Sequence, residues 1–466
     1  MRVNILKVKI IIIVAILLFG LCVSGSALPE VNATPAENNS PQPTEDDPVV
    51  SVIAEPDSTL PAMENNSGIL STAQPCFTTV GIDADSSITH PALWSVSPPI
   101  GGGGNYSEIS EIHLIGDGDT IRVWGGAEGH TYEDDITIRN SNVIIEQWEG
   151  SPVRPLITAK TDGTSTLTIQ TVDNVTLRGL DISNNHHSPN RGGGGGVYVR
   201  DATLTIEDSI IDNNTASLRG GGGVYVSEGG ALTIRDTAIH NNTATDYGGG
   251  GVCAESATLT IENAIVNNNT ANYGGGGVYV QDATATIENT NIHNNTASEF
   301  GAGVYGNNAR LTIGNTTLSN NTASSRGGGG VYVFQDSTLA IRDTIIRDNT
   351  ANYGGGGVDA RSATLTIENV TMHHNTGQGS GGGVYASSAP LTIRDATIYN
   401  NTATTGGGGV YANSATSTIE KTAISNNTAL SNGGGGVSVS GGLLAIGNTT
   451  IHDNTADYGG GGGLCL

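Results

Sequence analysis

One sequence unit recurs about ten times along this chain and limits the folds open to it. Each copy contains a run of glycines, an apolar triplet such as Val-Tyr-Val, a segment such as Thr-Leu-Thr-Ile, and an Asn-Asn-Thr ending. Thr, Val, Ile and Tyr fill the apolar segments, and a repeat of this length built from such residues is typical of a solenoid of short strands. The residue after each glycine run recurs every 26 to 28 positions, as Val197, Val224, Val252, Val278, Val304, Val331, Val358, Val384, Val410, Val437 and then Leu464.

Alternation of apolar and polar residues assigns faces to three strands in each unit. In the first strand Val197 shares one face with Val199, and Tyr198 lies on the other. In the second, Leu204 points inward with Ile206, and in the third one apolar position recurs. Stacked units turn these positions into continuous columns, so each coil completes the core of its neighbours. The sequence therefore predicts an all-β, three-sided β-helix.

The second asparagine of each ending is the same residue in all internal copies. A side-chain amide donates and accepts hydrogen bonds, so stacked copies can form an asparagine ladder at a tight corner. A ligand site is the alternative, but identity in every copy favours a structural role because a catalytic group is needed once. These asparagines are Asn214, Asn242, Asn269, Asn295, Asn321, Asn349, Asn375, Asn401, Asn427 and Asn454.

The glycine runs and the first asparagine of each ending carry weaker signals. No lysine or helix follows the glycines, as a phosphate-binding loop would require, so we expect them to supply positive φ and close approach between coils. The ending also matches the N-glycosylation sequon, and either glycosylation or a coincidental corner motif accounts for that match. The sequon asparagines are Asn213, Asn241, Asn268, Asn294, Asn320, Asn400 and Asn426.

The N-terminal part differs from the repeats. Basic residues precede an apolar run at 10–23 and small residues at 24–27, which predicts a cleaved signal peptide over residues 1–27. The apolar run is shorter than the ~20 residues that span a bilayer. Residues 28–111 begin with a stretch rich in Pro, Asn, Glu and Ser and are predicted to be a disordered tether, and residues 112–466 the β-helix. We expect a secreted or cell-surface protein.

Charge and cysteine usage exclude several classes of partner and site. The chain carries 44 Asp and Glu against 19 Lys and Arg, a formal net charge of −25. Such a protein repels nucleic acid and anionic membranes, so we expect no nucleic-acid partner and no membrane insertion after signal cleavage. Cys253 and Cys465 are eight coils apart, roughly 40 Å at ~4.8 Å per coil, whereas a disulfide needs Cα atoms within ~7 Å. No disulfide framework is expected.

The repeats resemble those of a known protein family. Residues 424–437, ISNNTALSNGGGGV, are similar to the paired FxxN and GGA(I/L/V) repeats of polymorphic outer membrane proteins, which are β-helical adhesins. Residues 116–138 look like the opening coil of pectate-lyase-like right-handed β-helices, which include carbohydrate-binding and sugar-cleaving proteins. The resemblance covers about 112–466 and implies a right-handed parallel β-helix. The chain departs from that family in two ways. The phenylalanine of FxxN is replaced by other residues, and the sequence ends at Leu466, in an eleventh coil, so we expect no barrel for anchorage in an outer membrane.

Sugar-cleaving enzymes use pairs of carboxylates as acid and base, and two groups of carboxylates in this chain have the residue types for that role. The first is Glu133, Asp134 and Asp135, which we expect to serve a turn or cap at the start of the β-helix. The second is Asp359, which occupies a tyrosine position of the repeat two residues before Arg361. We interpret this exception as drift on a solvated face. No catalytic residue is predicted.

The histidines do not form a convincing metal site in the sequence. One position of the repeat is shared by His240, His293, His373 and His452, but coils two or more apart lie ~10 Å or further from each other, too far for one zinc ion. His373 is followed by His374, and neighbours on a strand are expected to point to opposite sides. No metal and no cofactor are predicted.

Two rows of outward-facing residues are the remaining candidate binding surfaces. A tyrosine column can stack on sugar rings or anchor a protein partner, although stacking between coils also explains it. A Thr-x-Thr face resembles the rows of β-helical ice-binding proteins, but Arg310 and Pro390 interrupt it, so ice binding is not expected. The tyrosines are Tyr198, Tyr225, Tyr279, Tyr305, Tyr332, Tyr385 and Tyr411.

Next to the Thr-x-Thr face, opposite charges should meet if coils stack in register. Examples are Glu207 with Arg235 and Glu368 with Arg394. Together these patterns predict an adhesion or cell-envelope interaction protein without catalytic activity, with cell-surface glycans or proteins as possible partners. The alternative is a polysaccharide-binding or polysaccharide-cleaving β-helix.

Overall fold

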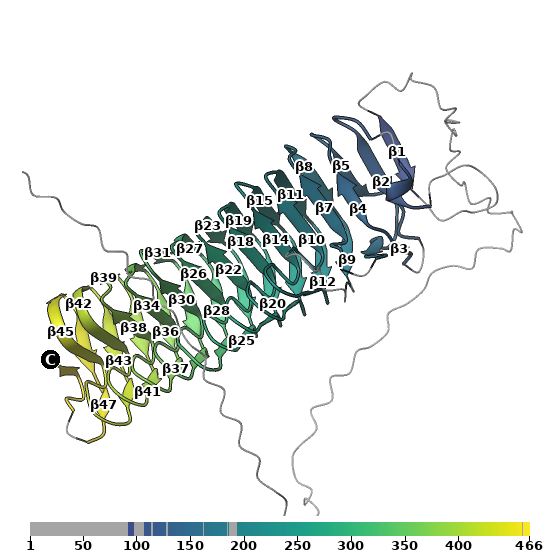
Figure 1. The fold of residues 1–466 in the computed structure, drawn as a ribbon. Coiled ribbons are helices and arrows are strands. Elements are labelled where there is room, and N and C mark those ends of the chain that lie inside the picture. Colours follow the sequence, from purple (N-terminus) through teal and green to yellow (C-terminus); the bar gives the residue numbers. More distant parts are fainter. Residues whose placement is uncertain are drawn as a thin grey trace, which may run out of the picture. The chain divides into compact units, whose positions relative to one another are not determined.

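The fold is a parallel β-solenoid, seen here in a computed structural model (Figure 1). Each coil stacks directly on the next, so that equivalent strands of successive coils pair in parallel. The predicted signal peptide and most of the predicted tether fall outside the described residues. The described residues are 92–96, 107–112, 115–126, 129–161, 163–183, 185, 193–458 and 460–466.

A regular coil contains four strands. In the first regular coil these are β10 (Val197–Arg200), β11 (Thr203–Glu207), β12 (Ile210–Asp212) and β13 (Thr215–Ala216). The three predicted strands are confirmed, and the two-residue strand after the asparagine corner is a fourth that the sequence patterns did not predict. The first and second strands of each coil belong to one 25-stranded sheet, the third strands to a 13-stranded sheet and the fourth strands to a 10-stranded sheet.

Later coils repeat this order. The first strands are β14 (Val224–Ser227), β18 (Val252–Glu255), β22 (Val278–Gln281), β26 (Val304–Asn307), β30 (Val331–Phe334), β34 (Val358–Arg361), β38 (Val384–Ser387), β42 (Val410–Glu420), β45 (Val437–Gly447) and β48 (Leu464–Cys465); β42 and β45 include the second strand of their coil. The other second strands are β15 (Ala231–Arg235), β19 (Thr258–Glu262), β23 (Thr284–Glu288), β27 (Arg310–Gly314), β31 (Thr338–Arg342), β35 (Thr364–Glu368) and β39 (Leu391–Arg394).

The short strands close each coil. Third strands are β16 (Ala238–His240), β20 (Ile265–Asn267), β24 (Asn291–His293), β28 (Thr317–Ser319), β32 (Ile345–Arg347), β36 (Thr371–His373), β40 (Thr397–Tyr399), β43 (Ala423–Ser425) and β46 (Thr450–His452). Fourth strands are β17 (Thr243–Ala244), β21 (Thr270–Ala271), β25 (Thr296–Ala297), β29 (Thr322–Ala323), β33 (Thr350–Ala351), β37 (Thr376–Gly377), β41 (Thr402–Ala403), β44 (Thr428–Ala429) and β47 (Thr455–Ala456).

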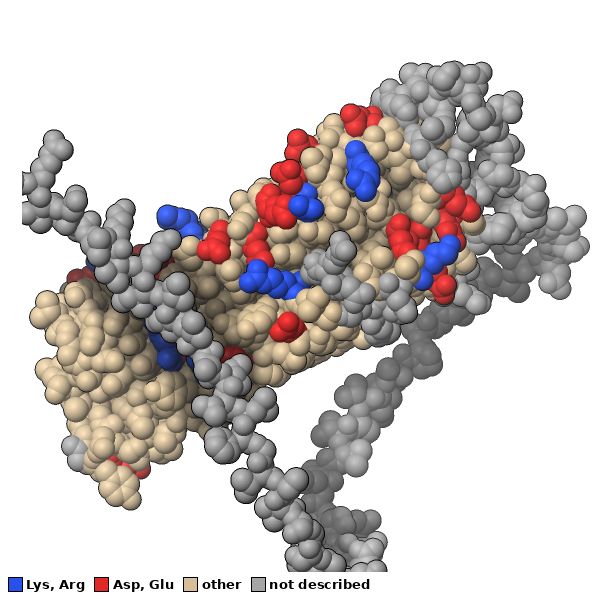
Figure 2. Space-filling view, in the orientation of Figure 1, with Lys and Arg blue, Asp and Glu red and all other residues tan. Residues whose placement is uncertain are grey.

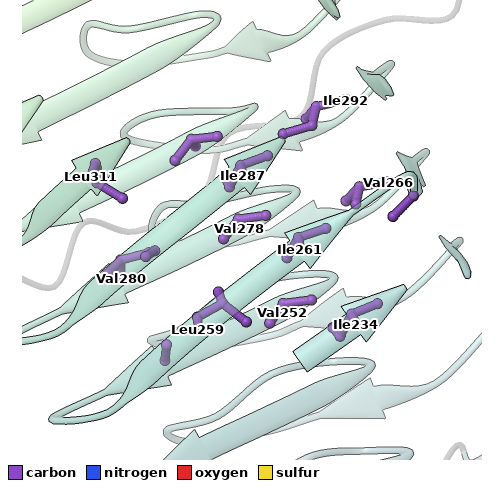
Figure 3. Packing of buried hydrophobic residues seen from close by; sticks show 14 of the residues in the cluster. Ile234, Val252, Leu259, Ile261, Val266, Val278, Val280, Ile287, Ile292 and Leu311 are labelled. Carbon is purple, nitrogen blue, oxygen red and sulfur yellow. The ribbon is translucent and has the colours of Figure 1, made fainter. Parts of the chain in front are cut away.

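The core is a set of aliphatic columns inside the coils. Figure 3 shows Val252, Ile261 and Val266 at equivalent positions to Val278, Ile287 and Ile292 of the next coil. These six side chains are fully buried. Because one coil is only one strand, or ~4.8 Å, thick along the axis, its apolar side chains find partners mainly in the coils above and below. This arrangement confirms the predicted dependence of each coil on its neighbours.

The β-helix begins earlier than residue 112, the start that the sequence indicates. Strand β1 (Leu93–Val96) pairs in parallel with β2 (Thr120–Val123), and a 3-10 helix, η1 (Ile109–Glu111), follows β1 in the chain. Less regular coils then lead to β10. Their strands are β3 (Thr131–Glu133), β4 (Ile136–Ile138), β5 (Ile144–Gln147), β6 (Leu156–Thr158), β7 (Leu167–Gln170), β8 (Val175–Arg178) and β9 (Asp181–Ser183).

The acidic residues of this first part have structural partners. Fully buried Asp119 accepts hydrogen bonds from the Trp94 indole at 2.7 Å and from the Gly116 amide at 2.8 Å. Asp134 accepts one from the Ser110 amide, and Asp135 accepts two from backbone amides of the loop at 160–161. These contacts agree with the cap or turn role expected for Asp134 and Asp135.

The predicted asparagine ladder is present at the corner after the third strand. Asn321 donates from Nδ2 to Oδ1 of Asn349 at 3.0 Å and to the carbonyl of Ile292 at 3.0 Å. Its own Oδ1 accepts from the backbone and side-chain amides of Asn295, each at 3.0 Å. From Asn214 to Asn427 the ladder asparagines are fully buried. Each amide therefore satisfies backbone groups that the tight corner would otherwise leave unpaired.

The residue before each ladder asparagine has left-handed backbone geometry. Its φ is 54° at Asn213 and at Asn320, 56° at Asp348 and 55° at His374. Asn and Asp tolerate this conformation better than other non-glycine residues, which explains why the sequon asparagine recurs there. The corner motif is thus a sufficient reason for the sequon match, and glycosylation stays a prediction.

The glycine runs are required by close contact between coils. A Cβ on Gly329 would lie 2.5 Å from the carbonyl oxygen of Gly356 and 2.6 Å from that of Thr350. Gly276 meets equivalent carbonyls at 2.6 Å, and Gly328 beside Gly329 has a φ of 75°. Both predicted reasons for the glycines are therefore confirmed.

The predicted charge register is also confirmed. Glu207 lies opposite Arg235, and Glu368 lies opposite Arg394. Ion pairs link neighbouring coils, as between Arg394 and Glu420 at 3.2 Å. On the face that Figure 2 shows, acidic and basic side chains lie beside one another rather than in separate patches.

Candidate functional site

The tyrosine column lies outside the aliphatic core but is mostly covered. Tyr279, Tyr305 and Tyr332 are only 2–3% exposed and form a second apolar cluster, separate from the core. Tyr305 stacks on Tyr279 with ring centroids 4.8 Å apart and on Tyr332 at 5.7 Å. Stacking between coils, one of the two predicted roles, is what the structure shows, and the burial leaves these three rings no face for a sugar.

A second row of side chains covers the tyrosine column. It consists of the residues that directly precede the glycine runs in six successive coils, and we call it the ridge. Tyr273 contacts Tyr305 at 5.9 Å between ring centroids, and Phe300 contacts Tyr332 at 4.8 Å. The ridge residues are Arg219, Tyr247, Tyr273, Phe300, Arg326 and Tyr353.

The outer side of the ridge faces solvent. Tyr247 is 49% exposed and Tyr353 is 56% exposed, whereas Phe300 is buried at 8%. Tyr247 contacts Tyr273 at 4.7 Å between centroids, and the Arg326 guanidinium lies 4.9 Å above the Phe300 ring. At ~4.8 Å per coil, the six positions span roughly 24 Å along the axis. The result is a row of aromatic side chains that is exposed at Tyr247 and Tyr353 and buried at Phe300, with a cation at or near each end.

The ridge does not show as a repeat in the sequence, because its residues differ from coil to coil. The position before the glycine run holds Arg, Tyr, Tyr, Phe, Arg and Tyr in successive coils, so no single residue recurs. The available signal was chemical class: six consecutive coils place an aromatic ring or a guanidinium there. Both groups are enriched at binding surfaces.

Asp359 is not on a solvated face, and that interpretation was wrong. Its side chain is fully buried in β34, in the tyrosine position of the repeat. The Arg361 guanidinium donates from Nε to Oδ1 at 3.0 Å and from Nη2 to Oδ2 at 2.9 Å. The error arose because the ridge and the glycine segments, which fold over the first strands, were not visible in a strand pattern.

Burial dominates the ionisation of this region. It raises the pKa of Tyr279, Tyr305 and Tyr332 far above the usual value for a phenol. Burial also raises the pKa of Asp359, and the hydrogen bonds from Arg361 offset part of that rise. The fully buried Cys253 thiol, in the tyrosine position of β18, has its pKa raised well above normal and is therefore unreactive.

A polar groove lies at the other end of the first strands. It has a volume of about 480 Å³ and crosses five coils at the corner between first and second strands. The small, buried residues Ala283 and Ala309 are part of its lining. Its walls include Asp282, Asn308, Arg310, Asp336, Thr258 and Thr338.

The adjacent histidines behave differently from the prediction. Nδ1 of His373 lies 2.7 Å from Nδ1 of His374, so the two rings meet instead of pointing to opposite sides. The reason is the left-handed φ of 55° at His374, which ends the strand alternation. Burial lowers the pKa of His373, and the neighbouring His374 adds to the effect. Among the described residues, no group of three or more His, Cys, Asp or Glu is placed to hold a metal ion.

Within the part of the chain that the structure describes, no helix has the length and apolar character needed to cross a membrane.

Comparison with known families agrees with this architecture. A family model described as a right handed beta helix region matches residues 112–274, 159–345, 264–403 and 383–466. These overlapping matches extend over more than half of the chain. The chain belongs to this family. The narrower resemblance to polymorphic outer membrane proteins stays a prediction, and no curated protein matches the chain.

Three solved structures are similar at low identity. The GH136 lacto-N-biosidase from Eubacterium ramulus has 10% identity and a TM-score of 0.34, covering 78% of this chain and 68% of its own. Pectate lyase Pel9A has 11% identity and a TM-score of 0.34, covering 79% and 80%. The A-module of the Azotobacter vinelandii mannuronan C-5 epimerase AlgE6 has 16% identity and a TM-score of 0.27, covering 75% and 91%. Scores this low support no conclusion about activity.

Proposed function

We propose that this β-helix is a secreted or cell-surface adhesion module that binds an extended glycan along the ridge. The observation that supports this is the exposed aromatic row, in which Tyr247 and Tyr353 keep about half of their surface in solvent. Side chains one coil apart recur every ~4.8 Å, close to the length of one sugar in an extended chain. Tyr247 and Tyr353, four coils or roughly 19 Å apart, can therefore stack on two sugars of the same extended chain.

The ends of the ridge add polar contacts. The Arg326 side chain is 59% exposed and pairs only loosely with Glu299, at 3.9 Å. A guanidinium donates several hydrogen bonds in one plane and binds carboxylates in a bidentate manner. Stacking on rings and hydrogen bonding to guanidinium groups require no bond cleavage, so the proposed role is binding without catalysis.

A glycan array probed with the full chain tests the proposal, followed by titration of hexasaccharides from cellulose, xylan, chitin and polygalacturonate. Tyr353→Ala and Tyr247→Ala should each weaken binding roughly tenfold, since exposed aromatic anchors carry about 1–2 kcal/mol. Tyr399→Ala is the matched control, because that half-buried ring stacks on His373 in the 13-stranded sheet. Absence of any glycan binding, or binding that the ridge variants leave unchanged, would overturn the proposal.

The groove supports a second candidate, polysaccharide cleavage. Asp282 and Asp336 lie two coils apart in the groove, roughly 10 Å between backbones, with Arg310 in the coil between them. Glycoside hydrolysis uses two carboxyl groups that flank one bond. Release of reducing ends from the same polysaccharides, lost in both Asp282→Asn and Asp336→Asn, would support this candidate over the ridge. Release that persists in both variants would exclude these carboxylates.

A further inference from the structure

Asp359 is one of the residues that interrupt the tyrosine column, and its coil lies directly beneath one end of the ridge. Asp359 stands between Tyr332 of β30 and Tyr385 of β38, where a ring would continue the stack. A carboxylate there is unusual, because Asp is almost never fully buried unless it is paired. The buried carboxylate of Asp359 therefore needs a partner that compensates its negative charge.

Arg361 provides that group and takes the place of the missing ring. Its Cζ lies 5.7 Å from the Tyr332 ring centroid and 5.0 Å from the Tyr385 ring centroid. Ring-to-ring distances elsewhere in the column are similar, 5.7 Å between Tyr305 and Tyr332. A planar guanidinium can stack on aromatic faces as a ring does. The stack of side chains therefore continues through this coil, although the residue at its tyrosine position is Asp359.

The space around Asp359 fits the pair closely. A Cβ on Gly327 or Gly354 would overlap the Asp359 carboxylate, and the Gly355 amide donates a hydrogen bond to it. Replacing a buried ion pair by well-packed apolar groups is often neutral or stabilising. A tyrosine at 359, as in the neighbouring coils, would continue the stack without a charge. Stability alone does not account for the pair.

Tyr353 is the one ridge residue that contacts the pair. Its ring centroid lies 5.4 Å from Cζ of Arg361, while 56% of the side chain is exposed. We infer that Asp359 and Arg361 are positioning residues that brace the Tyr353 ring for ligand binding. This inference rests on the proposed function of the ridge. The carboxylate holds the guanidinium, and the guanidinium supports one side of the ring.

The decisive variant restores the regular repeat in this coil. Asp359→Tyr combined with Arg361→Ser reproduces the residues of the next coil, Tyr385 and Ser387, so the altered coil has a folded precedent in the same protein. We expect a Tm equal to or above that of the wild type and a three- to tenfold loss of affinity for the hexasaccharide that the wild type binds most tightly. Tyr353→Ala should lose roughly tenfold.

The outcomes separate the inference from the proposed function. If Tyr353→Ala weakens binding and the double variant binds like the wild type, the brace is refuted and the ridge assignment stands. If Tyr353→Ala and Tyr247→Ala both bind normally, the ridge assignment itself fails. A double variant that loses Tm together with affinity would show that the pair is merely structural and would also refute the brace.

Arg361→Lys offers an independent check. Lysine keeps the charge beside Asp359 but lacks the planar group that stacks on Tyr353. We expect affinity to fall about threefold with the β-sheet circular dichroism spectrum unchanged. Unchanged affinity would argue against support of the ring by the guanidinium.

Discussion

The asparagine corner and the tyrosine column are both buried columns of the same repeat, yet they tolerate change very differently. The corner holds asparagine in every coil from Asn185 to Asn454, whereas the tyrosine column includes Cys253, Asp359 and Ser438. An asparagine such as Asn321 bonds to both neighbouring coils through donors and acceptors at once. A ring contributes mainly contact area, which other groups can supply, as Arg361 does. Variation, and with it any new function, is therefore possible at the ring column and excluded at the corner.

The largest expected effect concerns the ring column at alkaline pH. Burial raises the folded-state pKa of Tyr225, Tyr279, Tyr305 and Tyr332 above the unfolded value of about 10. Folding therefore favours the protonated phenol. The stability that these tyrosines contribute is fully present below pH ~10 and is lost as the pH rises above that value. Above pH ~10, each of these tyrosines should lower the free energy of unfolding by about 1.4 kcal/mol per pH unit, or roughly 5 kcal/mol per unit for all four.

Parallel recording of phenolate absorbance and circular dichroism measures this effect. The buried phenols should ionise only as the β-sheet signal is lost. Tyr332→Phe keeps the ring and removes one ionisable group, so its alkaline transition should be shallower and its midpoint higher. Ionisation of every tyrosine in a chain with an intact β-sheet signal would contradict the burial of the column.

The next effect tests the corner. Asn321→Ala removes hydrogen bonds on both sides and leaves backbone groups of the flanking coils unpaired, which should lower the free energy of unfolding by about 3 kcal/mol. Asn320→Gly is the matched control, because that exposed neighbour has a positive φ that glycine adopts freely. It should change stability by less than about 0.5 kcal/mol. Equal effects in urea denaturation would refute the distinction between the two asparagines.

The smallest effect tests the tolerance of the ring column. Tyr411 is half-buried, stacks on Tyr385 at 5.5 Å between centroids, and lies next to Ser438 in the same column. Tyr411→Ser should cost about 1 kcal/mol, mostly from lost ring contact. A loss as large as that for Asn321→Ala would show that the column tolerates change no better than the corner.

Much of the fold could be predicted from the repeat alone. The strand faces, the asparagine ladder, the glycine contacts and the charge register of Glu368 with Arg394 all follow from patterns that repeat every coil, because stacking places equivalent residues in contact. The opening strand of the β-helix at Leu93–Val96 was not predicted, since the first coils lack the repeat. The two-residue strand at Thr215–Ala216 was missed because it is too short to show alternation.

The candidate site was less predictable. Tyr305 was placed correctly on the outer face of its strand, yet its accessibility depends on Tyr273 and Phe300, which come from loop positions without a strand pattern. Asp359 is buried under the equivalent segments of its own part of the stack, at Gly327 and Gly354. His373 and His374 were assigned to opposite sides because the left-handed turn between strands is not visible as alternation.

By itself, the sequence determined the register of this protein, because a strict repeat with an inward apolar residue and an amide at a fixed spacing can stack in only one way. It determined for the same reason which side chains share a column. Only the tertiary structure decided which columns meet solvent, since exposure depends on the segments that fold over a strand. That is why the repeated tyrosines at 225, 279, 305 and 332 are covered, while Tyr247 and Tyr353, from the variable positions before the glycine runs, are exposed.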